Sequence, residues 1–394
     1  MRGKWLAKFC FLPVLPVVII ITYHPNRLIG LSQNHDASIL TTGNILNSSN
    51  SYVNSYVNTC LPADRITHFI MTKVEKTGSS TLFAILARFI LENQVNNILQ
   101  QHSMYHINWN HPRGKSWSVG PRHRRKADVL IDHAKYNEKM FSKHIAKDAK
   151  YIVPVREPES WISSAASYYS TWTRIHKSAD KIIKNKAAFY MPRRNLNPMG
   201  FGSWFHLTQL QWLGFDYNQR DDLDAIKSYI DYIVPKIDIL ILNEQYDASL
   251  LILMKRFCWE YTDMFYKSYM VQSAARPTIS PEARHILFSP EANLGEQLLY
   301  ERINETWWNQ REVKTEGFWE EVEHFKDLNA RVSNEWCREV TESGETRLIE
   351  ANRWHGVLSI TKRLCLYLRQ NKQWLTNNLL KYSRGQKKNF LEFQ

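Results

Sequence analysis

The sequence predicts an α/β protein whose parallel sheet is flanked by helices, with an N-terminal membrane anchor and a helical C-terminal part. From about residue 61, short apolar runs alternate with longer segments of helical periodicity, which is typical of a parallel sheet. One long apolar run lies near the N-terminus, and beyond about residue 275 the pattern is mainly helical. A mean hydropathy of −0.44 excludes a protein with many membrane spans.

The first element is the N-terminal apolar run, residues 9–23, which predicts a signal anchor. Basic residues precede the run, so we expect a cytoplasmic N-terminus and a lumenal body. With residues 5–8 included, the segment approaches the ~20 residues that span a bilayer. A cleaved signal peptide is the alternative, because the run is short and holds two prolines. The lack of a small-x-small cleavage site favours the anchor.

The chain then changes composition twice. A stretch rich in Asn and Ser is typical of a stem that holds the body away from the membrane, and the last 40 or so residues are basic. Glycosylation sequons at Asn47 and Asn304 agree with a lumenal body. The predicted segments are a cytoplasmic tail (1–8), a transmembrane anchor (9–23), a stem (24–60), a lumenal domain (61–340) and a basic C-terminal extension (341–394).

Four cysteines follow the apolar segment: Cys60, Cys258, Cys337 and Cys365. In an oxidising lumen they allow up to two disulfides, with three possible pairings, while a buried free thiol at Cys258 is the alternative. A net charge of +13 suits an anionic ligand, and no zinc-finger or RNA-binding signature accompanies it. We therefore expect no nucleic-acid partner.

The elements of the predicted lumenal domain follow from apolar periodicity. In chain order they are a strand at 68–74, a helix at 80–93, strands at 127–132 and 151–157, a helix from about 161, a helix at 221–234, a strand at 238–244 and a helix at 247–260.

The loop "EKTGSST", residues 75–81, joins the first of these strands to its helix. Lys76 adds a positive charge, and Gly78 lets the backbone approach an oxygen atom closely. Short hydroxyl donors come from Thr77, Ser79, Ser80 and Thr81. A helix N-terminus at the carboxyl edge of a parallel sheet is an anion site, so the loop predicts a phosphate cradle. An ordinary helix cap is the alternative.

The order of residues in this loop differs from that of ATP-binding P-loops. Such loops read G-x-x-x-x-G-K-[ST], whereas here Lys76 precedes Gly78. Asp132, at the end of a strand, could imitate the aspartate that holds a metal in those enzymes. A lumenal kinase of the P-loop type therefore stays open as an alternative.

A second anion site is predicted at "VREPESWISSAASYY". A strand ends at Arg156, and Ser164 falls on the early turns of the following helix. A guanidinium fork and a hydroxyl at a helix N-terminus both suit phosphate oxygens. Two such sites on neighbouring strand–helix turns predict a nucleoside ligand with phosphate groups at both ends.

These motifs resemble those of the Golgi galactose-3-O-sulfotransferases, a family that includes galactosylceramide sulfotransferase. The resemblance spans roughly residues 65–335 and rests on "KTGSST", "VREPESWISSAASYY", "DVLIDHAKYN" and "ILNEQYDASLLILMKRFCWEYTDMFY". It implies a P-loop-like sulfotransferase fold and the sulfuryl donor 3′-phosphoadenosine 5′-phosphosulfate (PAPS). It also implies a galactose 3-hydroxyl on a glycolipid or glycoprotein as acceptor, no required metal, and a single-pass type II protein of the Golgi membrane.

The resemblance also implies roles for individual residues. The 5′-phosphosulfate would be held by Lys76, Thr77, Gly78, Ser79, Ser80 and Thr81, and the 3′-phosphate by Arg156 and Ser164. Lys76 would also stabilise the departing phosphate oxygen. His133 is the expected base, and the alternatives are His102, His106 and Glu75. Sugar-stacking candidates are Trp109, Trp117 and Trp204.

Three residues depart from the family pattern. Glu75 stands where the family usually has His, Glu157 where it has Asp, and Asp132 where it has Asn. A carboxylate at position 75 would repel an anionic donor unless it points away or is paired with a lysine. These departures keep open a catalytically inactive, glycan-binding descendant of a sulfotransferase.

Overall fold

The structure is a computed structural model of the chain. It describes residues 60–100, 106–109, 117–119, 126–173, 178–192, 201–268, 279–290 and 292–383. The predicted anchor at 9–23 and the stem, except Cys60, lie outside these residues. No helix in the part of the chain that is described has both the length and the apolar character needed to cross a bilayer.

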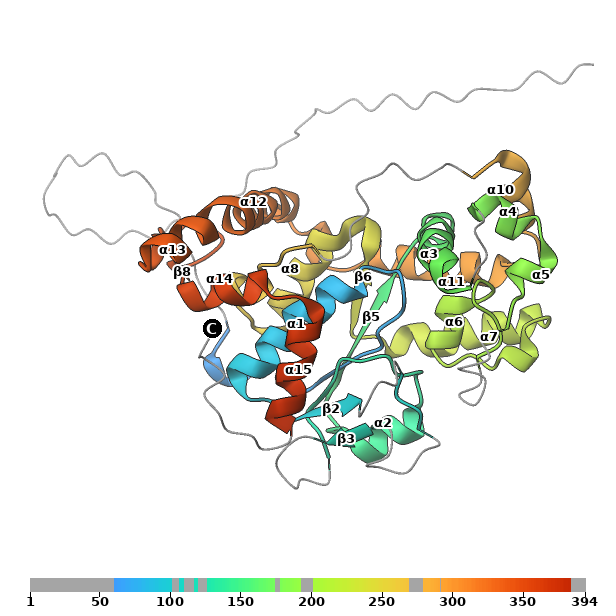
Figure 1. Ribbon diagram of the computed structural model, residues 1–394, viewed down its shortest axis with the longest axis horizontal. Coiled ribbons are helices and arrows are strands. Elements are labelled where there is room, and N and C mark those ends of the chain that lie inside the picture. The colour runs from blue at the N-terminus through green and yellow to red at the C-terminus, as the bar shows by residue number, and fades with distance from the viewer. Residues whose placement is uncertain are drawn as a thin grey trace, which may run out of the picture. The chain divides into compact units, whose positions relative to one another are not determined.

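A mixed sheet forms the centre of the molecule (Figure 1). Its strand order is β3-β2-β4-β1-β5-β6, and all neighbouring pairs are parallel except β2 and β3. The strands are β1 (Phe69–Met71), β2 (Asn97–Gln100), β3 (Trp117–Val119), β4 (Val129–Leu130), β5 (Lys150–Val155) and β6 (Ile239–Leu242). The predicted parallel sheet is therefore confirmed over five strands, while the pattern had not indicated β2 or β3.

Helices flank this sheet and continue through the C-terminal part (Figure 1). They are α1 (Ser79–Asn93), α2 (Glu138–His144), α3 (Pro158–Thr173), α4 (Ala179–Ile183), α5 (Lys186–Phe189), α6 (Thr208–Trp212), α7 (Leu223–Ile233), α8 (Tyr246–Phe257), α9 (Tyr261–Met264), α10 (Pro281–Leu287), α11 (Leu294–Trp308), α12 (Phe318–Arg331), α13 (Cys337–Ser343), α14 (Lys362–Arg369) and α15 (Lys372–Ser383). Short 3₁₀ turns are η1 (Pro62–Asp64), η3 (Tyr217–Gln219), η4 (Val234–Lys236), η5 (Asn243–Gln245) and η6 (Glu312–Lys314), and a π-helical turn, η7 (Val332–Trp336), joins α12 to α13.

Strand β1 and helix α1 are packed into the hydrophobic core. All three residues of β1 are buried, and β1 lies between β4 and β5. Phe69 and Phe89 pack edge to face beneath Trp259, which stacks on Phe89 with ring centroids 3.7 Å apart. Because β1, β4, β5 and β6 run in parallel, their carboxyl ends meet at one edge of the sheet.

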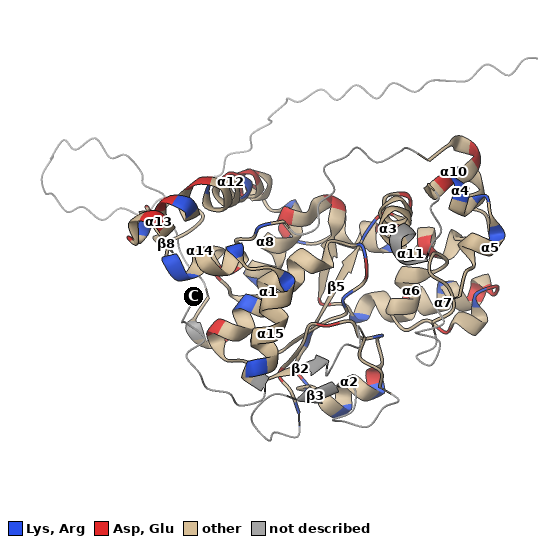
Figure 2. Cartoon of the chain, in the orientation of Figure 1, with Lys and Arg blue, Asp and Glu red and all other residues tan. Residues whose placement is uncertain are grey.

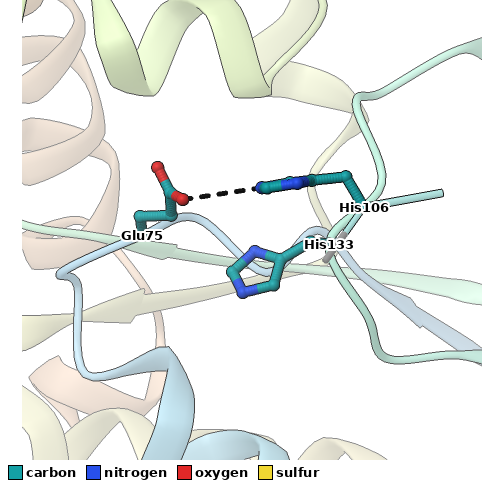
Figure 3. Close-up of side chains that lie close together, drawn as sticks. All are labelled: Glu75, His106 and His133. Atoms are coloured by element: carbon teal, nitrogen blue, oxygen red, sulfur yellow. Dashed lines mark ion pairs between the residues drawn. The ribbon is translucent and has the colours of Figure 1, made fainter. Parts of the chain in front are cut away.

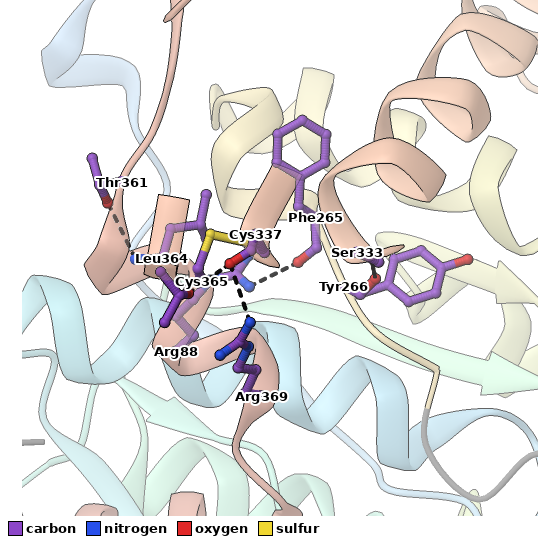
Figure 4. The surroundings of a disulfide bond; sticks show 10 residues. Arg88, Phe265, Tyr266, Ser333, Cys337, Thr361, Leu364, Cys365 and Arg369 are labelled. Atoms are coloured by element: carbon purple, nitrogen blue, oxygen red, sulfur yellow. Dashed lines mark hydrogen bonds between the residues drawn. A yellow bond between two sulfur atoms is a disulfide. The ribbon is translucent and has the colours of Figure 1, made fainter. Parts of the chain in front are cut away.

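Two disulfides resolve the cysteine pairing. Cys60 pairs with Cys258 and joins the start of the described domain to the end of α8. Cys337 pairs with Cys365 and joins α13 to α14 (Figure 4). The alternative of a free buried thiol at Cys258 was therefore wrong, because this residue lies next to Cys60 in space.

The residues after 340 fold onto the sheet domain. A hairpin of β7 (Arg347–Ile349) and β8 (Leu358–Ile360) leads into α14, and α15 then packs along α1 (Figure 1). Near the end of α15, the hydroxyl of Tyr382 donates a hydrogen bond to the backbone oxygen of Gln94. The basic tail beyond 383 lies outside the described residues.

Candidate functional site

A cavity of about 360 Å³ opens at the carboxyl edge of the parallel strands. It brings together the following residues that the sequence singles out: Glu75, Lys76, Gly78, Ser79, Ser80, Thr81, His133, Arg156 and Ser164. It also contains residues that the sequence analysis missed: Lys73, Tyr168, Tyr169, Asn243, Tyr246, Tyr266, Ser268 and Lys372. Both predicted anion sites therefore open into one cavity.

The loop before α1 owes its shape to two left-handed residues. Lys76 has a φ of 62° and Gly78 a φ of 76°. A Cβ atom on Gly78 would lie 2.8 Å from Nδ2 of Asn243, so the position is sterically closed to larger residues. The hydroxyls of Thr77 and Ser79 donate to the backbone oxygen of Val74, at 2.9 and 2.5 Å. These two hydroxyls close the turn before α1, and a helix N-terminus of this kind suits an anionic ligand.

Arg156 is held firmly at the end of β5. Buried Gln209 accepts a hydrogen bond from the backbone N–H of Arg156 at 3.0 Å and donates to its backbone oxygen at 2.9 Å. Nη1 of Arg156 donates to the backbone oxygen of Lys76 at 3.2 Å. The two strand–helix turns are therefore linked directly. Ser164 is buried on the second turn of α3 and lines the same cavity.

Glu157 acts as a helix cap. Its carboxylate accepts hydrogen bonds from the backbone N–H groups of Glu159 and Ser160, at 2.8 and 2.6 Å. These groups belong to the first turn of α3, where a negative side chain is favoured. The departure from Asp at this position thus keeps a carboxylate in a capping role.

Lys73 and His133 form a buried pair at the floor of the cavity. Nζ of Lys73 lies 3.0 Å from Nε2 of His133. Burial, with Lys372 as a further cause, lowers the pKa of Lys73 to about 7. Burial and the neighbouring Lys73 hold the pKa of His133 well below its usual value. His133 is therefore neutral near neutral pH, and Lys73 changes its charge there.

Glu75 faces His106, and His106 belongs to a segment that follows β2 (Figure 3). One carboxylate oxygen of Glu75 lies 3.6 Å from Nε2 of His106, and the rings of His106 and His133 are 5.2 Å apart. The neighbour of this carboxylate is therefore an imidazole, whereas the sequence had led us to expect a lysine as its partner. His102 lies outside the described residues.

Glu75, His106 and His133 could also hold a metal ion, since one ligand atom of each lies within 4.8 Å of the others. The ammonium group of Lys73 lies directly behind His133, and Lys372 adds a second positive charge nearby. A divalent cation at this point would be repelled by both lysines. The arrangement is better suited to proton transfer and ion pairing than to metal binding.

Aromatic side chains cover the opposite part of the cavity. Nζ of Lys76 lies 3.9 Å from the centre of the Tyr168 ring. Tyr169, Tyr246 and Tyr266 complete the aromatic lining, and Tyr266 donates to Asp247 at 2.8 Å. Flat rings beside cationic groups suit a ligand that joins a base to anionic phosphates.

A smaller cavity of about 200 Å³ involves the chain segments that continue from His106 and His133. It is lined by Ile107, Asn108, Trp109, Lys135, Tyr136, Asn137 and Gly214. Trp109 is thus the sugar-stacking candidate that reaches a cavity. Trp204 packs against Tyr169 with ring centroids 4.7 Å apart, and the side chain of Trp117 lies outside what the structure describes.

Comparisons with known proteins identify the family of this chain. The model of the galactose-3-O-sulfotransferase family matches residues 31–348. Human "Galactose-3-O-sulfotransferase 2" is 25% identical over 253 residues, which cover 62% of this chain and 61% of that protein. Mouse "Galactose-3-O-sulfotransferase 3" is 24% identical, with 60% and 56% covered.

A third relative is human "Galactosylceramide sulfotransferase", 23% identical over 295 residues that cover 72% of this chain and 66% of that protein. Each of these alignments thus covers less than two thirds of the relative. The family match spans both cationic turns of the cavity and the strands that carry them. The chain belongs to the galactose-3-O-sulfotransferase family.

Proposed function

We propose that this protein is a carbohydrate sulfotransferase that moves the sulfuryl group of PAPS to a hydroxyl of a terminal sugar, with the galactose 3-hydroxyl as the first candidate. The observation that carries the proposal is the direct link between the two cationic turns, where Arg156 donates to the backbone oxygen of Lys76 at 3.2 Å. A nucleotide with phosphate groups at both ends can meet both turns within one cavity.

The donor set of the cavity fits PAPS. Lys76, Gly78 and the start of α1 suit the 5′-phosphosulfate, while Arg156 and Ser164 suit the 3′-phosphate. The tyrosine rings suit the adenine base. Gly78 lets the backbone come close to phosphate oxygens, and a side chain at that position would collide with Asn243.

The bound donor would supply a sulfuryl group activated by its bond to phosphate. Burial keeps the imidazole of His133 uncharged near neutral pH, so the ring can accept a proton. Nδ1 of His133 is buried and has no hydrogen-bond partner within the described residues. His133 is then poised to take the proton of the acceptor hydroxyl, and Lys76 to offset the negative charge on the departing phosphate.

Two alternatives receive less support. A P-loop kinase would use Asp132 to hold a metal ion, yet this carboxylate accepts the backbone N–H of His133 at 2.8 Å, and Asp132 is not among the residues that line the cavity. The hypothesis of an inactive, glycan-binding descendant was based on the departures at Glu75 and Glu157. The first is paired with His106 and the second caps α3, so neither opposes donor binding.

The acceptor and the compartment belong to the same proposal. The relatives' names include transfer to galactose and to galactosylceramide, which favours a galactose-terminated glycolipid or glycoprotein glycan as partner. The apolar run at 9–23 favours a single-pass anchor in the Golgi membrane with the site in the lumen.

Incubation of the purified full-length chain with ³⁵S-labelled PAPS and an array of galactose-terminated glycans tests the function. We expect label on at least one glycan and a loss of about 100-fold or more in rate for His133→Ala and Lys76→Ala, which is typical of general-base and charge-stabilising residues. Full activity of His133→Ala would refute the base assignment. Binding of adenosine 3′,5′-bisphosphate without any labelled glycan would instead support the inactive descendant.

A further inference from the structure

The C-terminal helix α15 contributes a residue to the cavity lining although it follows the region that matches the family. The family match ends at residue 348, and α14 and α15 lie beyond it. In Figure 1, α15 lies beside α1, the helix that begins at the phosphate loop. Both C-terminal helices carry basic residues and no acidic ones (Figure 2).

Lys372, the first residue of α15, reaches the cavity. Its Nζ lies 5.6 Å from the centre of the Phe83 ring of α1. It lines the same cavity as Lys73 and His133, and its positive charge contributes to the lowered pKa of both groups. Lys372 therefore lies on the side of the cavity where the proposed transfer would take place.

The cavity gathers three lysines and an arginine: Lys73, Lys76, Lys372 and Arg156. Glu75 is the acidic residue among those that line it, and this carboxylate already faces His106. Like charges at such short range repel one another unless an anion lies between them. Four cationic side chains around one cavity therefore favour a negatively charged group in this part of it.

The position of Lys372 is fixed from two sides. Asn371 caps α15, and its side-chain oxygen accepts the backbone N–H of Trp374 at 2.8 Å. The disulfide between Cys337 and Cys365 holds α14, the preceding helix (Figure 4). In the same region, Arg369 of α14 donates to the backbone oxygen of Cys337 at 3.3 Å.

We propose that Lys372, at the start of α15, binds the phosphosulfate end of the donor nucleotide. This inference rests on the function proposed above. It adds a binding residue from a segment that the family match does not include. The ammonium group would contact oxygens of the sulfuryl group or of the 5′-phosphate, opposite the start of α1.

Isothermal titration calorimetry with adenosine 3′,5′-bisphosphate and with PAPS, without acceptor, tests this inference on the full-length chain. We expect Lys372→Met to weaken the binding of both nucleotides about tenfold or more, because a charge-assisted contact is lost. Lys372→Arg should keep the affinity within about threefold, since it keeps the charge. Lys381→Met removes an exposed lysine from the same helix and is the matched control with unchanged affinity.

Thermal unfolding without nucleotide separates binding from folding. We expect Lys372→Met to unfold at the same or a higher temperature, because repulsion from Lys73 is relieved. If this variant does not fold, Lys372→Gln takes its place. Wild-type affinity in the folded, uncharged variant would overturn the inference and leave the proposed function standing. A wild-type protein that binds neither nucleotide would overturn both.

Discussion

At the scale of single residues, Lys73 is the group whose charge we expect to follow ligand binding. Its pKa of about 7 leaves it largely neutral slightly above neutral pH. A bound phosphate favours the ammonium form and raises this pKa, so binding takes up a proton. Calorimetry with adenosine 3′,5′-bisphosphate at about pH 7.5, in buffers of different ionisation enthalpy, should show uptake of up to about one proton.

The control for this prediction is Lys135, a second lysine whose pKa burial lowers, to about 8, and which lines the smaller cavity. Lys73→Met should abolish the proton uptake, and Lys135→Met should leave it unchanged. Uptake that persists without Lys73 would show that another group titrates.

Residue identity alone predicted part of the site. Lys76, Arg156 and Ser164 stand out because they follow strands and precede or begin helices, and all three line the cavity. Lys73 could not be singled out, since a lysine near the end of a buried strand gives no sign that it turns toward a histidine on another strand. The role of Glu157 could not be seen either, because a departure from Asp after Arg156 does not show that the side chain caps the following helix.

At the scale of elements, the disulfide between Cys337 and Cys365 connects stability to binding. It closes a loop with a sequence separation of 28, for which chain-entropy arguments give about 3.6 kcal/mol of unfolding free energy. We expect the double substitution of both cysteines by serine to lose about that much in denaturant unfolding. At a temperature where the variant stays folded, its nucleotide affinity should fall as in Lys372→Met.

Combining the serine substitutions with Lys372→Met decides whether the disulfide acts through that lysine. If it does, the combined variant should bind no more weakly than Lys372→Met alone. Additive losses would mean that the disulfide supports the pocket by another route.

The elements with the clearest apolar periodicity were predicted correctly. The helix expected at 80–93 is α1, and the strands expected at 151–157 and 238–244 contain β5 and β6. β2 is four residues long and follows α1 after a short turn, so it has no periodicity of its own to detect. Helix α15 packs on α1, which is far away in the sequence. The amphipathic pattern of α15 does not show which element its apolar face contacts.

At the scale of the whole molecule, the topology explains how distant segments become one site. β1 pairs with both β4 and β5 in parallel, so the residues after these three strands, including Lys76, His133 and Arg156, reach the same edge of the sheet. The sequence had singled out all three of these residues, each at the carboxyl end of a predicted strand. Helix α15 adds Lys372 to the cavity because the C-terminal part of the chain packs back along α1.

The central claim is that one cavity holds a nucleotide by phosphate groups at both of its ends. The most direct measurement is calorimetric titration of the full-length chain with adenosine 3′,5′-bisphosphate and with adenosine 5′-monophosphate. We predict that the bisphosphate binds at least about tenfold more tightly, and that Arg156→Met removes this advantage, because the 3′-phosphate loses its guanidinium partner. Absence of heat with the bisphosphate, or equal affinity for both nucleotides, would contradict the claim.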